Sequence, residues 1–232
     1  MGRAFSLIPA FLLVSALAVS GQEALRGDVW VDLEPVYARY VDEPQPQDAA
    51  QKRAAAQRSA LEEAAMLYSA MIYGWSFNYE IGEKARGIAE QFELTPLGTV
   101  SFGDPGLRAT DAEIQEARLH LWTDYHLTDA QKRRMRMWRS GTVRNIQALG
   151  KGPLGGPVEA EDRLAIRTAA LEDAARAGIR AMLRGMERNR PREARGYIAL
   201  AEFPVYWVDA GYRMVSARFR VELAEIQPFA AY

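Results

Sequence analysis

Residues 161–190, EDRLAIRTAALEDAARAGIRAMLRGMERNR, and residues 212–225, YRMVSARFRVELAE, decide the fold of this chain. In the first segment, apolar and small side chains recur every three or four residues, which places them on one face of a helix that ends before Pro191. In the second segment, apolar and polar side chains alternate, as in an antiparallel strand with one buried face. Residues 209–211, Asp-Ala-Gly, are typical of the turn that joins this strand to the one before it. The sequence therefore predicts a long helix packed on a β-hairpin.

The charged residues of this helix are expected on its solvent side, away from the hairpin. They are Arg163, Arg167, Glu172, Asp173, Arg176, Arg180 and Arg184.

The composition excludes several classes of site. The chain has 232 residues, of which 49% are hydrophobic and 25% charged, as in an ordinary globular protein. A net charge of -1 gives no general attraction to nucleic acid. With no cysteine at all, disulfides, thiolate metal sites, a cysteine nucleophile and lipidation at a lipobox cysteine are excluded.

The N-terminal segment predicts export. Residues 1–3 are short and basic, residues 4–19 are apolar and uncharged, and small residues follow, which is the pattern of a secretory signal peptide over residues 1–21. The apolar run is short for a membrane span, although an uncleaved N-terminal anchor is the alternative. We therefore expect a periplasmic or secreted protein with no transmembrane segment after cleavage.

The mature chain is expected to be an α+β protein, with long amphipathic helices packed on antiparallel sheet. An extended, proline-rich arm (22–47) precedes a first α+β half (48–149), and a Gly/Pro linker (150–158) leads to the helix and β-hairpin half (159–232). Residues 59–65 and 169–175 carry similar alanine-rich helical sequences. The two halves are therefore either related by duplication or alike by chance.

Two sets of cations are candidates for binding an anionic partner. Residues 128–131, Thr-Asp-Ala-Gln, have the form of a capping box and predict a helix over 129–149 with an apolar stripe and no acid between Lys132 and Lys151. Its cations and those of the later helix could bind an acidic envelope protein or an anionic envelope surface, or could pair with acids of neighbouring elements. The candidate residues are Arg133, Arg134, Arg136, Arg139, Arg176, Arg180 and Arg184.

Two further groups of residues could form sites. Tyr73, Trp75, Phe77 and Tyr79 alternate along a predicted strand, so they form either an aromatic binding platform or part of the core. His120, Asp124 and His126 share one face of another predicted strand, over residues 114–127. Asp124 and His126 could hold a metal for a hydrolytic reaction, but the strand itself offers no third ligand within reach. The simpler interpretation is a solvated strand face.

Residues 167–176, RTAALEDAAR, followed by the strand over 215–223, resemble a module of exported proteins. They are similar to the small outer-membrane lipoprotein module that recurs in the flagellar T-ring protein FlgT. The missing lipobox cysteine departs from the lipoprotein members. The resemblance implies a non-catalytic envelope or assembly protein, and it supplies no catalytic residue and no cofactor. We therefore expect a non-enzymatic binding or assembly protein of the cell envelope, associated with flagellar or outer-membrane structures and not with nucleic acid.

Overall fold

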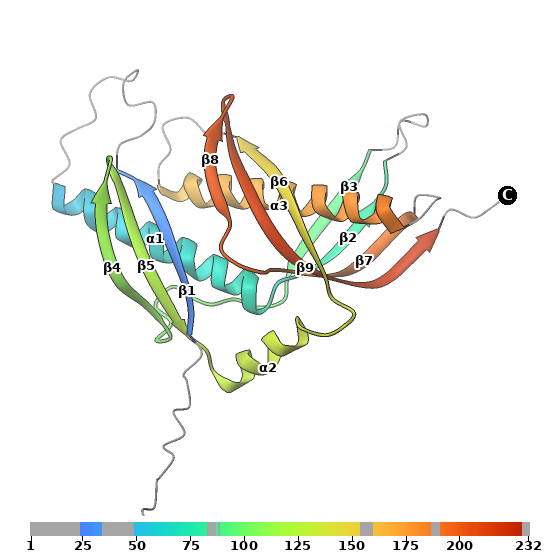
Figure 1. The fold of residues 1–232 in the computed structure, drawn as a ribbon. Helices are drawn as coiled ribbons and strands as arrows, with labels where there is room; N and C mark the ends of the chain where they lie inside the picture. Colours follow the sequence, from blue (N-terminus) through green and yellow to red (C-terminus); the bar gives the residue numbers. More distant parts are fainter. Residues whose placement is uncertain are drawn as a thin grey trace, which may run out of the picture.

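The computed structural model of the chain describes residues 24–33, 49–82, 87, 89–153, 160–186 and 191–228. These residues form an α+β fold in which helices pack on two antiparallel sheets, as the sequence predicts (Figure 1). The helices are α1 (Ala49–Ile72), α2 (Asp129–Met137) and α3 (Ala160–Met186). The predicted signal peptide, most of the predicted arm and residues 154–158 of the predicted linker lie outside the described residues.

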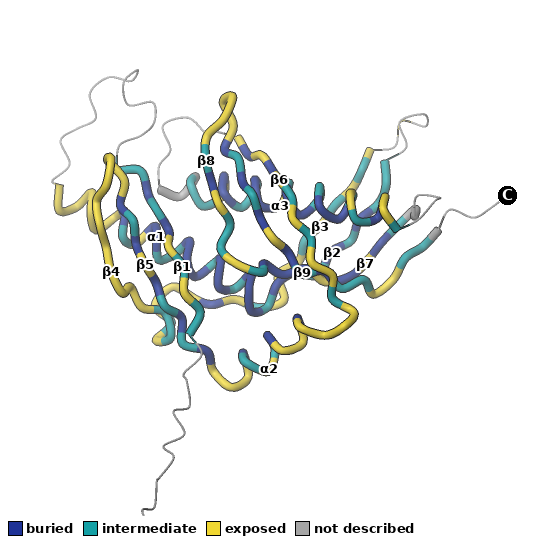
Figure 2. Tube along the Cα trace, in the orientation of Figure 1, coloured by how far each residue is buried: buried dark blue, intermediate teal, exposed yellow. Residues whose placement is uncertain are grey.

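The smaller sheet has the order β1-β5-β4, from β1 (Ala24–Asp32), β5 (Arg118–His126) and β4 (Leu107–Gln115). Alternate residues of β1 and β5 face α1, where Val29, Leu119 and Leu121 are buried. The strand predicted over 114–127 is wrong in extent, because the chain turns back at Glu116 and Ala117, both with positive φ. Figure 2 shows that β4, at the outer edge, is exposed along nearly its whole length.

The larger sheet has the order β3-β2-β7-β9-β6, and β8 pairs with β9. Its strands are β2 (Trp75–Glu80), β3 (Gln91–Pro96), β6 (Arg144–Pro153), β7 (Pro191–Leu200), β8 (Val205–Asp209) and β9 (Tyr212–Pro228). The predicted alternation of β9 is confirmed, since Val215, Ala217, Phe219 and Val221 are buried. Helix α3 packs on β6 and β9, and Ala210 and Gly211 form the β8–β9 turn with positive φ.

The start of the predicted Gly/Pro linker is an ordered strand. Gly150 and Gly152 lie in β6 and face α3, whose backbone comes so close that a Cβ at Gly150 would lie 2.2 Å from the carbonyl oxygen of Ala170. Glycine at these positions therefore lets the helix approach the strand closely. The linker prediction is wrong for residues 150–153.

The predicted basic helix over 129–149 is also wrong in extent. Helix α2 has the predicted capping box at Thr128 and Gln131, but it ends at Met137, and residues 144–153 form β6. Ile146 and Leu149 of the predicted apolar stripe are three residues apart, which fits one face of a helix, but in the strand they lie on opposite sides, and Leu149 is 57% exposed. Pairing with β9 and packing under α3 decide the outcome in favour of the strand.

The predicted halves do not correspond to the two sheets. Strand β2, from the predicted first half, lies in the larger sheet between β3 and β7, and β7 belongs to the predicted second half. Strand β6, also from the first half, pairs with β9. The buried residues of both sheets and of α1 and α3 form one continuous core.

Candidate functional site

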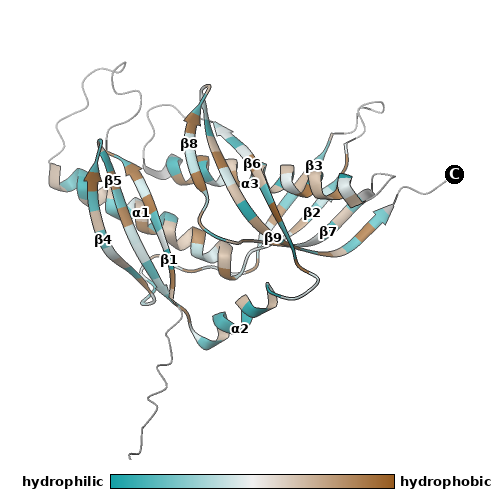
Figure 3. Cartoon of the chain, viewed as in Figure 1, coloured by the Kyte–Doolittle hydropathy of each residue, from teal (hydrophilic) through white to brown (hydrophobic). Residues whose placement is uncertain are grey.

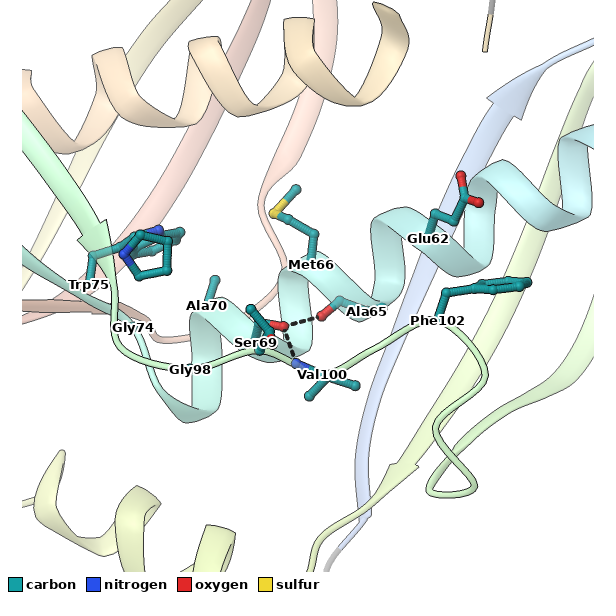
Figure 4. Close-up of a pocket in the computed structure, with 12 residues that line it drawn as sticks. Glu62, Ala65, Met66, Ser69, Ala70, Gly74, Trp75, Gly98, Val100 and Phe102 are labelled. Atoms are coloured by element: carbon teal, nitrogen blue, oxygen red, sulfur yellow. Dashed lines mark hydrogen bonds between the residues drawn. The ribbon is translucent and has the colours of Figure 1, made fainter. Parts of the chain in front are cut away.

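An apolar groove runs along one side of α1. It encloses about 330 Å³ and is bounded by the segment after β3 and by the start of β2. Figure 4 shows Trp75 at one end, Glu62 and Phe102 at the other, and Met66 between them. Phe102 is 50% exposed, although an aromatic ring of this size is usually covered. The guanidinium of Arg58 lies over this ring, 5.4 Å from its centre.

The far wall of the groove is held by hydrogen bonds to α1. The hydroxyl of Ser69 donates to the carbonyl of Ala65 at 2.6 Å and accepts the N–H of Val100 at 2.7 Å (Figure 4). By contrast, the peptide groups of Gly98 and Thr99, which line the groove, have no hydrogen-bond partner within the described part of the chain. The groove thus combines an apolar floor with free main-chain polar groups on its rim.

A second candidate site lies where the edge strand β1 approaches α1, α3 and the β8–β9 hairpin. We call it the Trp30 cluster, and it consists of Trp30, Asp32, Glu63, Arg118, Arg163, Arg167, Tyr206 and Arg213.

At the centre of the Trp30 cluster, Arg167 is only 2% exposed. Its guanidinium lies between two rings, 4.3 Å from the centre of the Trp30 ring and 4.6 Å from that of Tyr206. It donates to the carboxylate of Glu63 and, at 3.1 Å, to the carbonyl of Trp30. Arg163 also donates to that carbonyl, and its Nη2 lies 2.7 Å from Oε2 of Glu63. One buried carboxylate from α1 therefore faces two arginines from α3.

The outer part of the Trp30 cluster adds two arginines and one acid. Asp32 accepts from Arg118 at 2.9 Å and lies 3.8 Å from Arg213. Burial lowers the pKa of Arg213, and it lowers the pKa of Arg163 to about 10, because a buried guanidinium loses its hydration. The same burial, with the nearby charge of Glu63, raises the pKa of Tyr206.

The predicted partner-binding cations of α2 are only partly free. Arg133, Arg136 and Arg139 are exposed, as expected, and hydrophilic residues dominate this helix in Figure 3. Arg134, however, lies over the ring of Trp138 and donates to the carbonyl of Tyr73 at 3.4 Å. Trp138 is itself buried and donates to the carbonyl of Ile72, and Met135 is buried as well, so this part of the apolar stripe packs within the fold.

The predicted arginine row on α3 is largely paired with acids. Arg176 contacts Asp173 on the same helix, and Arg180 binds both carboxylate oxygens of Glu90. Burial tends to raise the pKa of Glu90, but the hydrogen bonds from Arg180 and Tyr79 outweigh it and lower the pKa overall. Arg184 is exposed and, of these three arginines, is the one without an acid partner among the described residues.

The predicted aromatic platform belongs mostly to the core. Phe77 and Tyr79 are 3% and 1% exposed, and both pack against Phe92 on β3. Burial and Glu90, to which the hydroxyl of Tyr79 donates at 2.6 Å, raise the pKa of Tyr79 to about 12. Tyr73 is half-buried and accepts a hydrogen bond from Gln131. The remaining residue of the row, Trp75, is half-buried and lines the apolar groove.

The predicted face of β5 with the histidines is confirmed in its alternation. His120, Asp124 and His126 are half-buried on the side of β5 that faces away from α1, and Asp124 lies 3.4 Å from Arg26. Among the described residues, no three His, Asp or Glu side chains gather as a metal site would require.

The Trp30 cluster and the apolar groove were not predicted as sites. The sequence pattern assigned Arg163 and Arg167 to the solvent side of the helix, and the structure buries Arg167 instead. A weak signal existed, because Glu63 interrupts the alanine-rich part of α1 at a position that the helical spacing shares with Ser59 and Ala60.

Comparison with known proteins identifies relatives but no function. A family model matches residues 14–229 of the chain. A protein of Treponema pallidum (strain Nichols), described as an uncharacterized protein, is 26% identical over 198 residues, which cover 82% of this chain and 79% of the relative. No solved structure matches the chain. Within the described residues, no helix combines the length and apolar character that crossing a bilayer needs.

Proposed function

We propose that this chain, which belongs to the family whose model it matches, is an exported, non-catalytic protein of the cell envelope that acts by binding and assembly. The apolar groove along α1 is the observation that carries the proposal. Its exposed Phe102 and its half-buried Met66 and Trp75 remain in contact with water in the free protein. A partner that covers them gains the free energy of removing apolar surface from water.

The occupant that fits the groove is an apolar segment of a partner protein. The groove is open on one side, so an acyl chain in it would keep part of its surface in water. An amphipathic segment would instead place its apolar side chains inside and its polar side chains outside. The free peptide groups of Gly98 and Thr99 add main-chain hydrogen-bonding capacity, which a peptide uses and a hydrocarbon does not. Met66 supplies a flexible, polarisable surface that adapts to such a segment.

The proposed location depends on the sequence. Residues 1–21 have the pattern of a signal peptide, and the resemblance of residues 167–176 and 215–223 to the envelope module favours a partner in outer-membrane or flagellar structures. N-terminal sequencing of the protein from its native envelope should find a start between residues 19 and 22. An intact Met1 would contradict export with cleavage.

Site-specific photo-crosslinking tests the groove. A photoreactive residue in place of Met66 should form an adduct with one envelope protein, and mass spectrometry should map the adduct to an apolar segment of it. The same residue in place of Ala181, which is exposed on α3 away from the groove, is the matched control. An adduct with lipid would favour a lipid-binding function, and equal labelling from both positions would refute the groove as the docking surface.

A charge in the groove provides a second test. Met66→Glu should abolish co-fractionation with the partner, because the carboxylate would have to leave water on docking. Ala181→Glu adds the same charge at an exposed helix position and should leave co-fractionation unchanged. Circular dichroism establishes that both variants are folded. If folded Met66→Glu still co-fractionates, the partner binds elsewhere.

A further inference from the structure

We propose that the Trp30 cluster is a binding site for a dianionic oxyanion of the phosphate type, held between Arg213 and Arg118 beside Trp30. Within the described residues, the cluster contains four arginines and only two acids, Asp32 and Glu63. Two positive charges therefore have no acid of their own, and three of the four arginine side chains, all but that of Arg118, are at most 13% exposed. Buried charge of this kind is costly unless it is paired, so the excess calls for an anion.

Two guanidinium nitrogens of the cluster support the same conclusion. Nε of Arg167 and Nη1 of Arg213 are buried and have no hydrogen-bond partner. The two residues are 2% and 8% exposed, so water does not readily replace the missing acceptor. A buried donor without an acceptor is destabilising, whereas an oxyanion supplies several acceptors at once.

Ring stacking accounts for the buried charge of Arg167 but not for that of Arg213. Arg167 lies between Trp30 and Tyr206, which explains how its charge is tolerated. Arg213 is 5.6 Å from the centre of the Trp30 ring and 3.8 Å from Asp32, so both of its contacts are loose. Asp32 is moreover shared with Arg118, which approaches it more closely. Arg213 is thus the arginine of the cluster with the least internal compensation.

The same geometry favours a ligand that enters beside Arg118. The side chain of Arg118 is 45% exposed, whereas those of Arg213 and Arg163 are 10% and 13% exposed. An anion arriving from solvent would meet Arg118 first and then reach the unpaired nitrogen of Arg213. A dianion neutralises both surplus charges, whereas a single carboxylate leaves one of them uncompensated. This site is separate from the groove and does not depend on the proposed docking function.

The test titrates the full mature protein with inorganic phosphate at a pH at which phosphate is a dianion. It measures the Tm of the protein and, by calorimetry, its affinity for phosphate. Phosphate also stabilises proteins without specific binding, because it is excluded from their surfaces. The comparison is therefore between variants. Arg213→Gln removes the proposed ligand-binding cation, and Arg218→Gln removes an exposed cation of the same strand, which is paired with Glu202 at the surface.

The expected result is a saturable rise in Tm with phosphate in the wild type and in Arg218→Gln, and an affinity weakened by about tenfold or more in Arg213→Gln. Equal responses of all three proteins would show that only the general salt effect acts, and would overturn the proposal. Sodium acetate at the same ionic strength should stabilise less than phosphate. An equal effect of acetate would overturn the preference for a dianion.

The Tm measured without added oxyanion distinguishes a binding role of Arg213 from a structural role. In chloride buffer, Arg213→Gln should have a Tm equal to or above that of the wild type, because it removes one of the surplus buried charges. If Arg213 instead serves the fold through Asp32 and Trp30, the variant should melt well below the wild type, and the proposal would be wrong.

Discussion

At the scale of single residues, Glu63 is a buried acid of α1 that pairs with two arginines of α3. It is 1% exposed and is the only acid of α1 that faces Arg163 and Arg167. Glu63→Gln removes the charge and leaves two largely buried guanidinium groups uncompensated. We expect a loss of about 3–5 kcal/mol in the free energy of unfolding, measured by chemical denaturation.

The neighbouring Glu62 provides the control for that loss. It lies on the same helix and pairs with Arg58 at 2.9 Å, but its side chain is 38% exposed. Glu62→Gln should cost less than about 1 kcal/mol, as is usual for surface ion pairs. Similar losses in the two variants would show that burial of the Glu63 pair has no special effect on stability.

Glu90 should make stability depend on pH. Its pKa is lowered from 4.5 in the folded protein, so its ion pair with Arg180 stabilises the fold fully above the unfolded pKa, and that contribution is lost as pH falls through the folded pKa. Glu90→Gln should therefore be less stable than the wild type at neutral pH, and the difference should shrink as pH falls through the lowered pKa of Glu90. Urea denaturation over a series of pH values measures this, and a constant difference would contradict the assignment.

The residues of the candidate sites were the least predictable part of the chain. Periodicity assigns arginine to the solvent, since an isolated charge is rarely buried, and Arg167 departs from that rule because Glu63 reaches it from a helix more than a hundred positions earlier. Trp30 acquires its role in the same way, through contacts with Arg118, Arg167 and Arg213 that are distant in sequence. No local pattern reports such a pairing.

At the scale of elements, the close contact between α3 and β6 depends on glycine. A Cβ at Gly150 would meet backbone atoms of Ala170 and Ala174 at 2.2–2.3 Å, and backbone gives way less easily than a side chain. Gly150→Ala should therefore destabilise the protein by about 1–3 kcal/mol or more. At Gly185, in α3, a Cβ would meet no other described part of the chain within 4 Å beyond its own helix backbone, so Gly185→Ala should be neutral or slightly stabilising. Thermal denaturation compares them, and equal effects would refute the role of close packing.

Helix α2 and the turn after it offer a different test, because the exposed side chains of Arg133, Arg136 and Arg139 make no hydrogen bond or ion pair among the described residues. Replacing Arg133, Arg136 and Arg139 together with Gln should leave the fold intact and slow association with an anionic envelope partner, more so at low salt. Association rates at two salt concentrations measure the effect. An unfolded triple variant would mean that these arginines are internal partners, and an unchanged rate would place the interface elsewhere.

Elements whose apolar residues recur with the period of their own structure were predictable, and elements whose apolar spacing fits another structure were not. Helix α3 and strand β9 carry long runs of a single period, which agree with the structure. In β6, the three-residue spacing of Ile146 and Leu149 fits a helix, and only the pairing with β9 and the packing under α3 make this segment a strand. The turn at Glu116 and Ala117 contains neither glycine nor asparagine, the residues that usually mark positive φ, so the sequence gives no warning of it.

At the scale of the whole molecule, the order of strands in the larger sheet makes the chain one folding unit. The sheet takes β2, β3 and β6 from before residue 154 and β7, β8 and β9 from after residue 190. β7 is paired between β2 and β9, and β9 between β7 and β6. The Glu63 contacts to Arg163 and Arg167 then join α1 to α3 across the same division.

Expressing residues 24–153 and 160–228 as separate chains tests this organisation. Each fragment would expose strand edges and apolar faces that the other covers in the intact protein, and burial lost on that scale exceeds the marginal stability of a domain. We therefore expect neither fragment alone to give a dispersed NMR spectrum or a cooperative melting transition, whereas the intact chain should melt in a single step. A mixture of the two fragments should recover native circular dichroism, because the strand pairs and α1–α3 contacts can form between chains. A stably folded fragment would instead support the division into two halves that the sequence suggests, and the interleaved sheet would then contribute little to cooperativity.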